Sequence, residues 1–210
     1  MRLSATGSGL LFEDGDPVKI GVLALQESFA EHAEALRRIG AEPVLVRLPE
    51  HLAGIEGLII PGGESTTIGK LQVLPGLLDP INNAIEQGMP VYGTCAGMIL
   101  LAKDIGGLDQ PLLGAMDIRV RRNAFGRHLE SFEEGVRVPA LGENPFPGIF
   151  IRAPLIEETG SGVTVLARLS DGRAVAAEQG RLLVSAFHPE LTNDPRMHRH
   201  FLGMITTRKA

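Results

Sequence analysis

Cys95, the single cysteine of the chain, lies in a segment whose residues are typical of a nucleophile elbow. The segment reads YGTCAG over residues 92–97, follows an apolar run and precedes a helix-like stretch at residues 98–103. In such an elbow, glycines allow a sharp turn from strand to helix, and the apex side chain stands at a helix N-terminus, which favours a thiolate. An isolated cysteine is more often a small buried hydrophobic residue. Gly93 and Gly97 on either side favour a nucleophile instead, and therefore acyl-transfer chemistry.

His188 and Glu190 are the types of group that such a nucleophile needs. They follow the apolar run LLVSAF at residues 182–187. In an extended segment, residues two apart face the same side, so the imidazole and the carboxylate can share one face at a strand end. A histidine base oriented by a carboxylate activates a thiol. Alone, the tripeptide HPE would be interpreted as an exposed pair, but together with the elbow it predicts a catalytic set of Cys95, His188 and Glu190.

A glycine turn at residues 61–63 follows the apolar run GLII at residues 57–60. Its backbone N–H groups can form an anion-binding nest. A phosphate cradle is one interpretation, but Glu64 directly follows the glycines and the Lys-Ser/Thr ending of a P-loop is missing. An oxyanion hole fits better, with one donor from Gly63 and another from the backbone of Ala96, the residue after the nucleophile.

Arg122 is a candidate for binding a carboxylate. If residues 118–122 form a strand, Arg122 shares a face with the apolar residues Ile118 and Val120. An arginine on an apolar face needs an anionic partner, and the α-carboxylate of an amino-acid substrate would serve. The alternatives are that its guanidinium reaches solvent or pairs with an internal glutamate.

The three motifs, in the order PGGES, GTCAG and HPE, resemble those of the triad-type class I glutamine amidotransferases. Further segments are similar to the glutaminase subunits of pyridoxal 5'-phosphate synthase, and these are VLALQ at 22–26, EH at 31–32, RNAFGR at 122–127, SFE at 131–133, FIRAP at 150–154 and FHPELT at 187–192. The resemblance covers about residues 19–205. It implies an α/β fold, a three-layer flavodoxin-like class I glutamine amidotransferase domain around a central, mostly parallel sheet.

The resemblance also implies an activity and a site. The protein would hydrolyse L-glutamine to L-glutamate and ammonia through a thioester on Cys95, with His188 as general base and Glu190 as the partner of that base. Glutamine binding is assigned to Gly63, Glu64, Ser65, Arg122, Ile151 and Arg152.

The resemblance implies a protein partner as well. The ammonia would pass to a separate synthase subunit, a (β/α)8 barrel that makes pyridoxal 5'-phosphate (vitamin B6), within a large hetero-oligomer. Gln26 would lie near that contact, and Glu27 stands where the family usually has glycine.

Composition agrees with a cytoplasmic enzyme. The 210 residues are enough for one domain with a buried core, and 44% are hydrophobic. One cysteine excludes an internal disulfide and a thiolate zinc cluster. A net charge of -5 offers no electrostatic basis for binding nucleic acid, and no membrane segment is evident. Residues 1–16 are expected to be a flexible extension and residues 17–210 the amidotransferase domain, and no motif requires a cofactor or a metal.

Periodicity predicts alternating strands and helices in the first half of the chain. The expected strands are residues 19–25, 43–46, 57–60, 90–92, 118–122, 148–151, 163–169, 174–178 and 182–187, and the expected helices are 29–39, 77–87 and 196–206. Parallel strands place reactive groups at their carboxyl ends, where Gly63, Cys95 and His188 fall. His32 on the first helix is expected to face solvent or an interface. His198 and His200, two apart on the last helix, point to different sides, which argues against a metal site.

Two other classes of function remain open on the residues alone. A cysteine peptidase or small-molecule hydrolase could use the same scaffold, although it would not need Arg122 and Arg152 for an amino-acid carboxylate. A glutamine-sensing or structural subunit is a non-enzymatic alternative. The intact set of Cys95, His188 and Glu190 argues against it.

Overall fold

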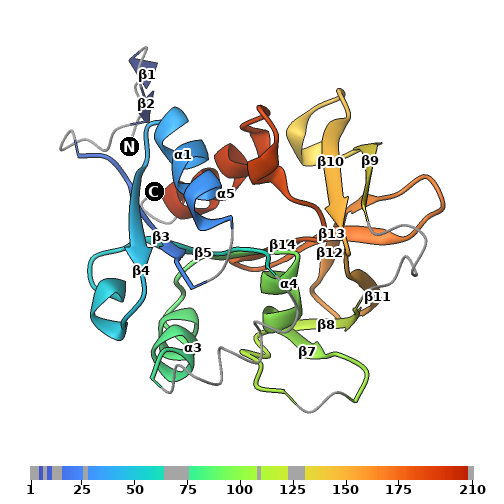
Figure 1. Ribbon diagram of the computed structural model, residues 1–210, viewed down its shortest axis with the longest axis horizontal. Helices are drawn as coiled ribbons and strands as arrows, with labels where there is room; N and C mark the ends of the chain where they lie inside the picture. Colours follow the sequence, from blue (N-terminus) through green and yellow to red (C-terminus); the bar gives the residue numbers. More distant parts are fainter. Residues whose placement is uncertain are drawn as a thin grey trace.

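The structure is a computed structural model that describes residues 5–6, 9–10, 16–25, 28–63, 76–107, 110–122 and 131–207. Its central feature is a curved sheet with helices on both faces (Figure 1). One half of the sheet is parallel, and its strands, in spatial order, are β4 (Glu42–Val46), β3 (Lys19–Leu23), β5 (Gly57–Ile60), β6 (Val91–Thr94) and β14 (Leu182–Ser185).

The other half of the sheet is mainly antiparallel. Beyond β14 the order continues through β13 (Ala174–Gln179), β11 (Leu155–Thr159), β8 (Met116–Arg121) and β7 (Ala102–Asp104), and β12 (Thr164–Arg168) pairs with β13. A separate antiparallel pair consists of β9 (Ser131–Val136) and β10 (Phe146–Ile151). Near the N-terminus, β1 (Ala5–Thr6) pairs with β2 (Gly9–Leu10), and most of the expected extension lies outside the described residues.

Helices cover the two faces of the parallel half. Figure 1 shows α1 (Phe29–Arg38) and α5 (Arg196–Thr206) on one side, and α3 (Leu78–Glu86) and α4 (Ala96–Leu101) on the other. Single turns of 3-10 helix connect the elements at η1 (Pro49–Leu52), η2 (Pro139–Leu141) and η3 (Pro189–Leu191). The expected three-layer α/β architecture is therefore confirmed.

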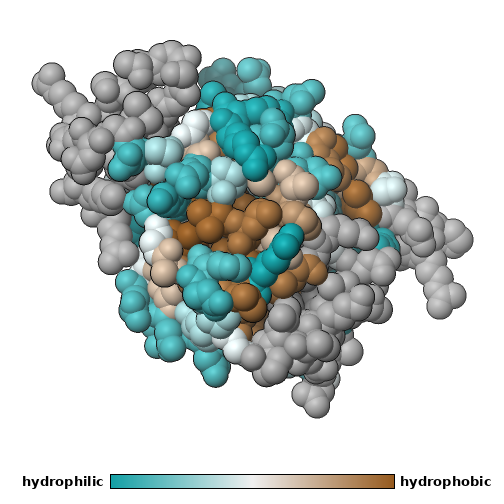
Figure 2. Space-filling model, turned by 60° about the vertical axis from the view of Figure 1, so that its left-hand side comes forward, coloured by the Kyte–Doolittle hydropathy of each residue, from teal (hydrophilic) through white to brown (hydrophobic). Residues whose placement is uncertain are grey.

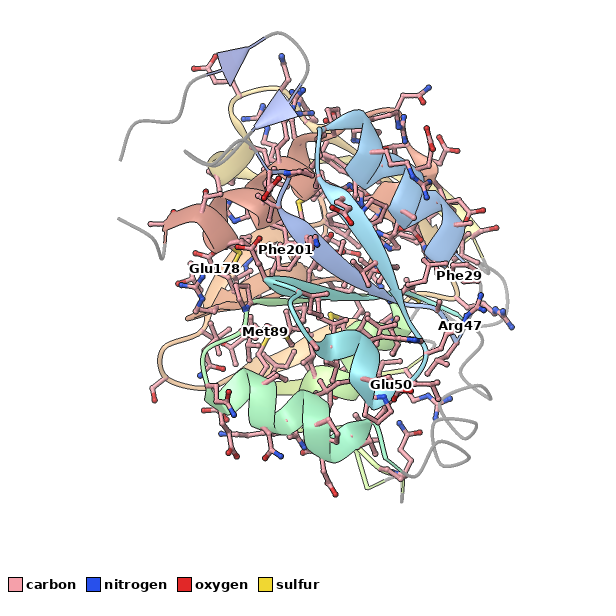
Figure 3. All side chains as sticks on the ribbon, turned by 90° about the vertical axis from the view of Figure 1, so that its left-hand side faces the viewer. Phe29, Arg47, Glu50, Met89, Glu178 and Phe201 are labelled. Atoms are coloured by element: carbon pink, nitrogen blue, oxygen red, sulfur yellow. The ribbon has the colours of Figure 1, made fainter. Side chains whose placement is uncertain are left out.

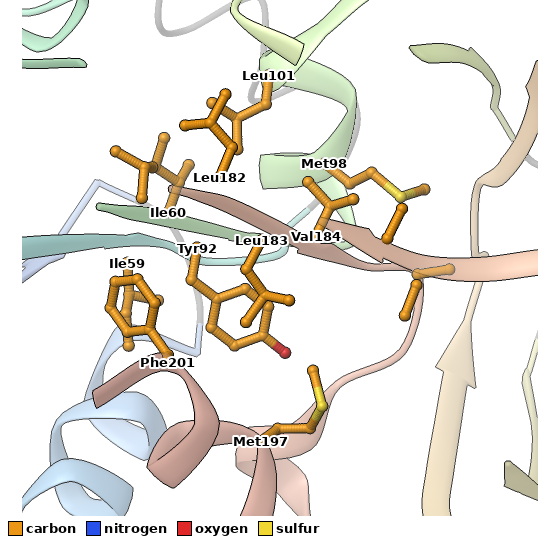
Figure 4. Packing of buried hydrophobic residues seen from close by; sticks show 14 of the residues in the cluster. Ile59, Ile60, Tyr92, Met98, Leu101, Leu182, Leu183, Val184, Met197 and Phe201 are labelled. Carbon is orange, nitrogen blue, oxygen red and sulfur yellow. The ribbon is translucent and has the colours of Figure 1, made fainter. Parts of the chain in front are cut away.

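The strands β5, β6 and β14 are buried along their whole length. Their sequences are almost continuously apolar because helices pack on both faces of the sheet. Figure 4 shows Ile59, Tyr92 and Leu183 on one face with Met197 and Phe201 of α5, and Ile60, Leu182 and Val184 on the other with Met98 and Leu101 of α4. The buried Tyr92 hydroxyl lies 2.9 Å from Ser185 Oγ, so this polar atom inside the core has a partner.

Several element boundaries differ from those expected. The helix after Cys95 ends at Leu101, and Lys103, which was expected in this helix, lies in β7, because residues 102–104 pair with β8. The strand expected at residues 118–122 is β8, which ends at Arg121, so Arg122 is not part of it. The expectation that Arg122 lies on the apolar face of a strand is wrong for that reason.

Candidate active site

Cys95 stands at the apex of a strained turn between β6 and α4. Its backbone has φ 48° and ψ -102°, values that a residue with a side chain rarely adopts. The flanking glycines allow this turn to pack closely. A Cβ on Gly93 would lie 2.6 Å from the Gly97 carbonyl, and a Cβ on Gly97 would overlap the Ile60 carbonyl oxygen of β5. The sharp turn from strand to helix that the sequence predicts at Cys95 is therefore present in the structure.

The parallel strands bring the three motifs to one edge of the sheet. Gly93 lies opposite Ile60 of β5, and Thr94 lies opposite Ser185 of β14, so the segments that follow these strands emerge together. A Cβ on Gly62 would lie 2.5 Å from Cε1 of His188 and 3.0 Å from Cβ of Cys95. Residues that are distant in the chain thus meet at the carboxyl ends of parallel strands.

His188 and Glu190 form a buried pair. His188 Nδ1 lies 2.7 Å from Glu190 Oε1, and the two side chains are 7% and 0% exposed. Glu190 lies in the 3-10 turn η3 rather than in an extended segment, so the expected pairing is present with a different backbone conformation. His188 Nε2 is buried and has no hydrogen-bond partner among the described residues, and this leaves it available to the thiol of Cys95 or to a substrate.

The surroundings of His188 and Glu190 favour the charged form of both side chains. Burial opposes a charged imidazole, but interactions with Cys95 and Glu190 outweigh it and raise the pKa of His188 to about 10. Burial likewise opposes an ionised Glu190, but His32 and His188 lower its pKa to about 2. At neutral pH the arrangement is thus an imidazolium beside a carboxylate.

Ile151 and Arg152 also reach the site. Cys95 Sγ lies 3.9 Å from the carbonyl oxygen of Ile151, the last residue of β10. The next residue, Arg152, is exposed and has φ 44°, a second unusual backbone angle close to Cys95. Strain of this kind gathers at binding and catalytic sites, which fits the binding role expected for these two residues.

The remaining expected site residues are less directly placed. Gly63 follows the turn whose Gly62 N–H donates to Thr94 Oγ1 at 3.0 Å, and Ala96 is the first residue of α4, where N–H groups have no acceptor within the helix. Arg122 Nη1 donates to Gln110 Oε1 at 3.2 Å, so in this contact its acceptor is an amide rather than a glutamate. Gln26, Glu64 and Ser65 lie outside the described residues.

Sequence reasoning missed a buried histidine beside the pair. His32 is fully buried on α1, which contradicts its expected place in solvent or at an interface. Its Nε2 lies 3.3 Å from both Glu190 Oε2 and Thr94 Oγ1, and its Nδ1 lies 3.0 Å from Nε2 of the buried His198. Helix periodicity carried a signal, because position 32 falls between Phe29 and Leu36 on the apolar face.

A pocket of about 470 Å³ lies apart from these residues. It is lined by Leu52, Ile55, Glu56, Ala84, Gln87, Met89, Arg181 and Ile205. Figure 3 labels Met89, one of the lining residues, and Figure 2 shows hydrophobic residues gathered in the middle of one face with hydrophilic residues on several sides of them. None of the catalytic candidates lines this pocket.

The described residues contain neither a membrane span nor a metal cluster. In these ranges no helix is both long and apolar enough to cross a membrane. The same part of the chain contains no group of three His, Cys, Asp or Glu side chains that could hold a metal ion.

Comparison with known proteins adds independent information. The model of the SNO glutamine amidotransferase family matches residues 22–207. A protein of Roseiflexus sp. (strain RS-1) called pyridoxal 5'-phosphate synthase subunit PdxT is 60% identical over 187 residues, which are 88% of this chain and 99% of that protein. The protein of the same name from Herpetosiphon aurantiacus is 59% identical with the same coverage.

Solved structures give the same result for the fold. A crystal structure described as a glutamine amidotransferase is 53% identical, with a TM-score of 0.83 over 89% of this chain and 98% of that one. A chain in the structure of PurLQS from Thermotoga maritima is 18% identical with a TM-score of 0.66, and the match covers 89% of this chain and 98% of that one. At that identity the second likeness concerns the fold alone.

Proposed function

Because the chain belongs to the SNO glutamine amidotransferase family, we propose that it is the glutaminase subunit of a pyridoxal 5'-phosphate synthase. It hydrolyses L-glutamine to L-glutamate and ammonia and passes the ammonia to a separate synthase subunit. The observation that carries this proposal is the buried His188–Glu190 pair beside the strained Cys95. A fold likeness alone would not assign a reaction, but a thiol, an imidazole and a carboxylate gathered at one strand edge support acyl transfer.

Cys95 is the nucleophile in the proposed reaction. Its thiolate attacks the side-chain amide carbon of glutamine, and the carbonyl electrons move to oxygen. When the C–N bond breaks, His188 gives its Nε2 proton to the departing nitrogen, and a γ-glutamyl thioester remains. His188 then takes a proton from water, which attacks the thioester and releases glutamate and the thiolate. Glu190 holds the imidazole in orientation and stabilises its positive charge.

The oxyanion and the amino-acid end of glutamine have separate binding groups. The backbone N–H groups of Gly63 and Ala96 are proposed to receive the oxyanion. The glutamine itself is bound by Gly63, Glu64, Ser65, Arg122, Ile151 and Arg152. An arginine suits the α-carboxylate, because its guanidinium can make two parallel charge-assisted hydrogen bonds. No step of this hydrolysis draws on a cofactor.

The chemistry of ammonia, the product, is the reason to expect a partner protein. Bulk water would protonate free ammonia and remove its nucleophilicity, so it must pass directly to an acceptor. The proposed acceptor is a (β/α)8-barrel synthase subunit that builds pyridoxal 5'-phosphate from a pentose phosphate and a triose phosphate. The two subunits form a large cytoplasmic hetero-oligomer, with Gln26 near the contact.

The experiment that tests the function is glutamate release by the purified chain, alone and mixed with its synthase. Cys95→Ala should abolish release in both conditions while binding to the synthase persists, because the thiol acts chemically. A glutamine-analogue electrophile should label Cys95 in the wild type. Substantial glutamate production by Cys95→Ala would exclude the nucleophile, and a wild type without glutaminase activity in the mixture would exclude the function.

The isolated chain is expected to be a weak glutaminase. Ammonia made without an acceptor is lost, and the glycines of the turn at residues 61–63 let a peptide change orientation at little steric cost. One misaligned oxyanion donor lowers kcat by roughly 10²- to 10³-fold. Partner binding would favour the aligned state if the partner binds it more tightly. Equal rates for the chain alone and the mixture at saturating glutamine would show an autonomous enzyme.

A further inference from the structure

A buried network of polar side chains connects helices α1 and α5 with the carboxylate of Glu190. Glu190 uses Oε1 for His188, whereas Oε2 has no aligned hydrogen-bond partner among the described residues and lies 3.3 Å from His32 Nε2. On its other side, His32 Nδ1 lies 3.0 Å from His198 Nε2 of α5. Both of these histidines are fully buried. Buried imidazoles are costly unless they are hydrogen-bonded, so their position against Glu190 calls for an explanation.

The protonation states follow from burial. Burial lowers the pKa of His32, although Glu190 opposes this, and burial together with His32 lowers the pKa of His198 to about 3. Both rings are therefore neutral near pH 7, and each has a single N–H. The hydrogen bond between them can run in one of two directions.

One direction satisfies more groups than the other. If His198 Nε2–H donates to His32 Nδ1, then His32 keeps its proton on Nε2, where it is aligned with Thr94 Oγ1 and lies beside the Glu190 carboxylate, with Nε2 3.3 Å from Oε2. In the reverse direction His32 would present a lone pair to that carboxylate. His198 Nδ1, which is buried without a partner among the described residues, would then have to bury an unpaired N–H. The first direction avoids both costs.

Thr94 links the same imidazole to the glycine turn. Its Oγ1 lies 3.3 Å from His32 Nε2 and accepts a hydrogen bond from the Gly62 N–H at 3.0 Å. Gly62 directly precedes Gly63, the proposed oxyanion donor. His32 Nε2 is thus shared between the carboxylate that orients the base and the hydroxyl that supports the turn.

We infer that His32 is a positioning residue of the glutaminase, which fixes Glu190 through its second oxygen and is itself held in the required tautomer by His198. The inference rests on the proposed function, in which Glu190 orients His188. His32 does not touch the substrate or the thiol, so its effect passes through Glu190 and Thr94. Outer partners of metal-binding histidines change activity by roughly 10- to 100-fold when they are removed, and we expect an effect of the same size here.

The test compares two substitutions of His32 with a matched control in the complete complex with the synthase. His32→Leu removes the donor, and His32→Gln places an amide N–H near the position of Nε2. The control is His200→Leu. His200 lies on α5 like His198, and its Nε2 is 3.2 Å from Oε2 of Glu178 in β13, so this variant also removes a His–Glu contact, but one outside the network around Glu190. Glutamate release gives kcat and KM for each protein.

Removal of the donor should act on turnover rather than on glutamine binding. His32→Leu should lower kcat by about 10- to 100-fold and leave KM within about twofold. His32→Gln should recover most of kcat, and His200→Leu should match the wild type. A kcat of His32→Leu close to wild type, or equal losses for His32→Leu and His32→Gln, would overturn the inference.

A second measurement does not depend on activity. The proton on His188 Nδ1, held 2.7 Å from Glu190 Oε1, should give a downfield proton NMR signal in the wild type. The signal should shift upfield or broaden in His32→Leu and persist in His200→Leu, and an unchanged signal in His32→Leu would overturn the inference even if the glutaminase assignment failed. If His32→Leu does not fold, His198→Leu, which removes the group that sets the tautomer, should show the same changes at smaller size.

Discussion

Gly62→Ala is expected to damage catalysis through one added methyl group. Gly62 does not have a positive φ, so alanine meets no backbone strain there. The obstacle is space, because the new Cβ would lie 2.5 Å from His188 Cε1, 3.0 Å from Cys95 Cβ and 3.2 Å from His188 Nδ1. Carbon atoms in contact normally lie about 3.5 to 4.0 Å apart. The imidazole or the glycine turn must therefore move by about 1 Å.

Either movement misaligns the proposed reaction. The His188 ring is buried and tied to Glu190, so shifting it stretches the 2.7 Å contact, while shifting the turn displaces Gly63. A misplacement of about 1 Å costs roughly 100-fold in rate, which is about 2.7 kcal/mol in activation free energy. Overpacking should also lower the free energy of unfolding by about 1 to 3 kcal/mol.

The assay is steady-state glutamate release at saturating glutamine in the presence of the synthase, with thermal unfolding of each protein. Gly203→Ala is the matched control, because Gly203 lies in α5 without positive φ and with open space around its Cβ position. That variant should keep its kcat and gain about 0.5 to 1 kcal/mol of stability. A folded Gly62→Ala with a kcat within about threefold of wild type would refute the steric reasoning.

Other substitutions separate the roles of the charged groups. Glu190→Gln should lower kcat less than His188→Ala, since the base transfers protons and the carboxylate orients it; wild-type activity of Glu190→Gln would mean that another group holds His188. Arg122→Ala should raise the KM for glutamine roughly ten- to a hundredfold, because a lost charge-assisted bond costs about 1.5 to 3 kcal/mol, and an unchanged KM would remove Arg122 from the site. Burial lowers the pKa of His198 from 6.5 to about 3. Below about pH 6.5 the unfolded state therefore binds a proton at His198 that the folded state does not. The free energy of unfolding then falls, as the pH is lowered, by up to about 1.4 kcal/mol per pH unit. Urea unfolding of His198→Phe between pH 7 and pH 5 should show a smaller loss than wild type, and an equal loss would contradict this assignment.

The elbow was predictable because its determinants are local. A strand, two glycines and an apex residue followed by a helix occupy a few consecutive positions, and the structure has φ 48° at Cys95 as such a turn requires. The pairing of His188 with Glu190 was also predictable from the sequence, since the two residues are only two positions apart and their side chains can meet without any tertiary contact. The extended backbone predicted for these residues was wrong, because Pro189 begins a 3-10 turn rather than continuing a strand.

The position of Arg122 could not be predicted from the local sequence pattern. Alternation of side chains along residues 118–122 depends on where the strand ends, and β8 ends at Arg121. Strand ends are set by pairing with neighbours, here β11 and β7, and the sequence does not display this pairing. The role of Arg122 in binding glutamine therefore rests on the family resemblance and stays a prediction.

By itself, the sequence identified the candidates for nucleophile, base and orienting carboxylate, since Cys95, His188 and Glu190 each lie in a short motif at the end of an apolar strand. The place of His32 was decided only by the tertiary structure. Periodicity can put it on the buried face of α1, but its partners are 62, 158 and 166 residues away in the chain. Thr94, Glu190 and His198 meet it only because parallel pairing aligns the ends of β6 and β14 and because α1 and α5 cover the same face of the sheet. Contacts of that kind follow from packing and have no signature in local spacing.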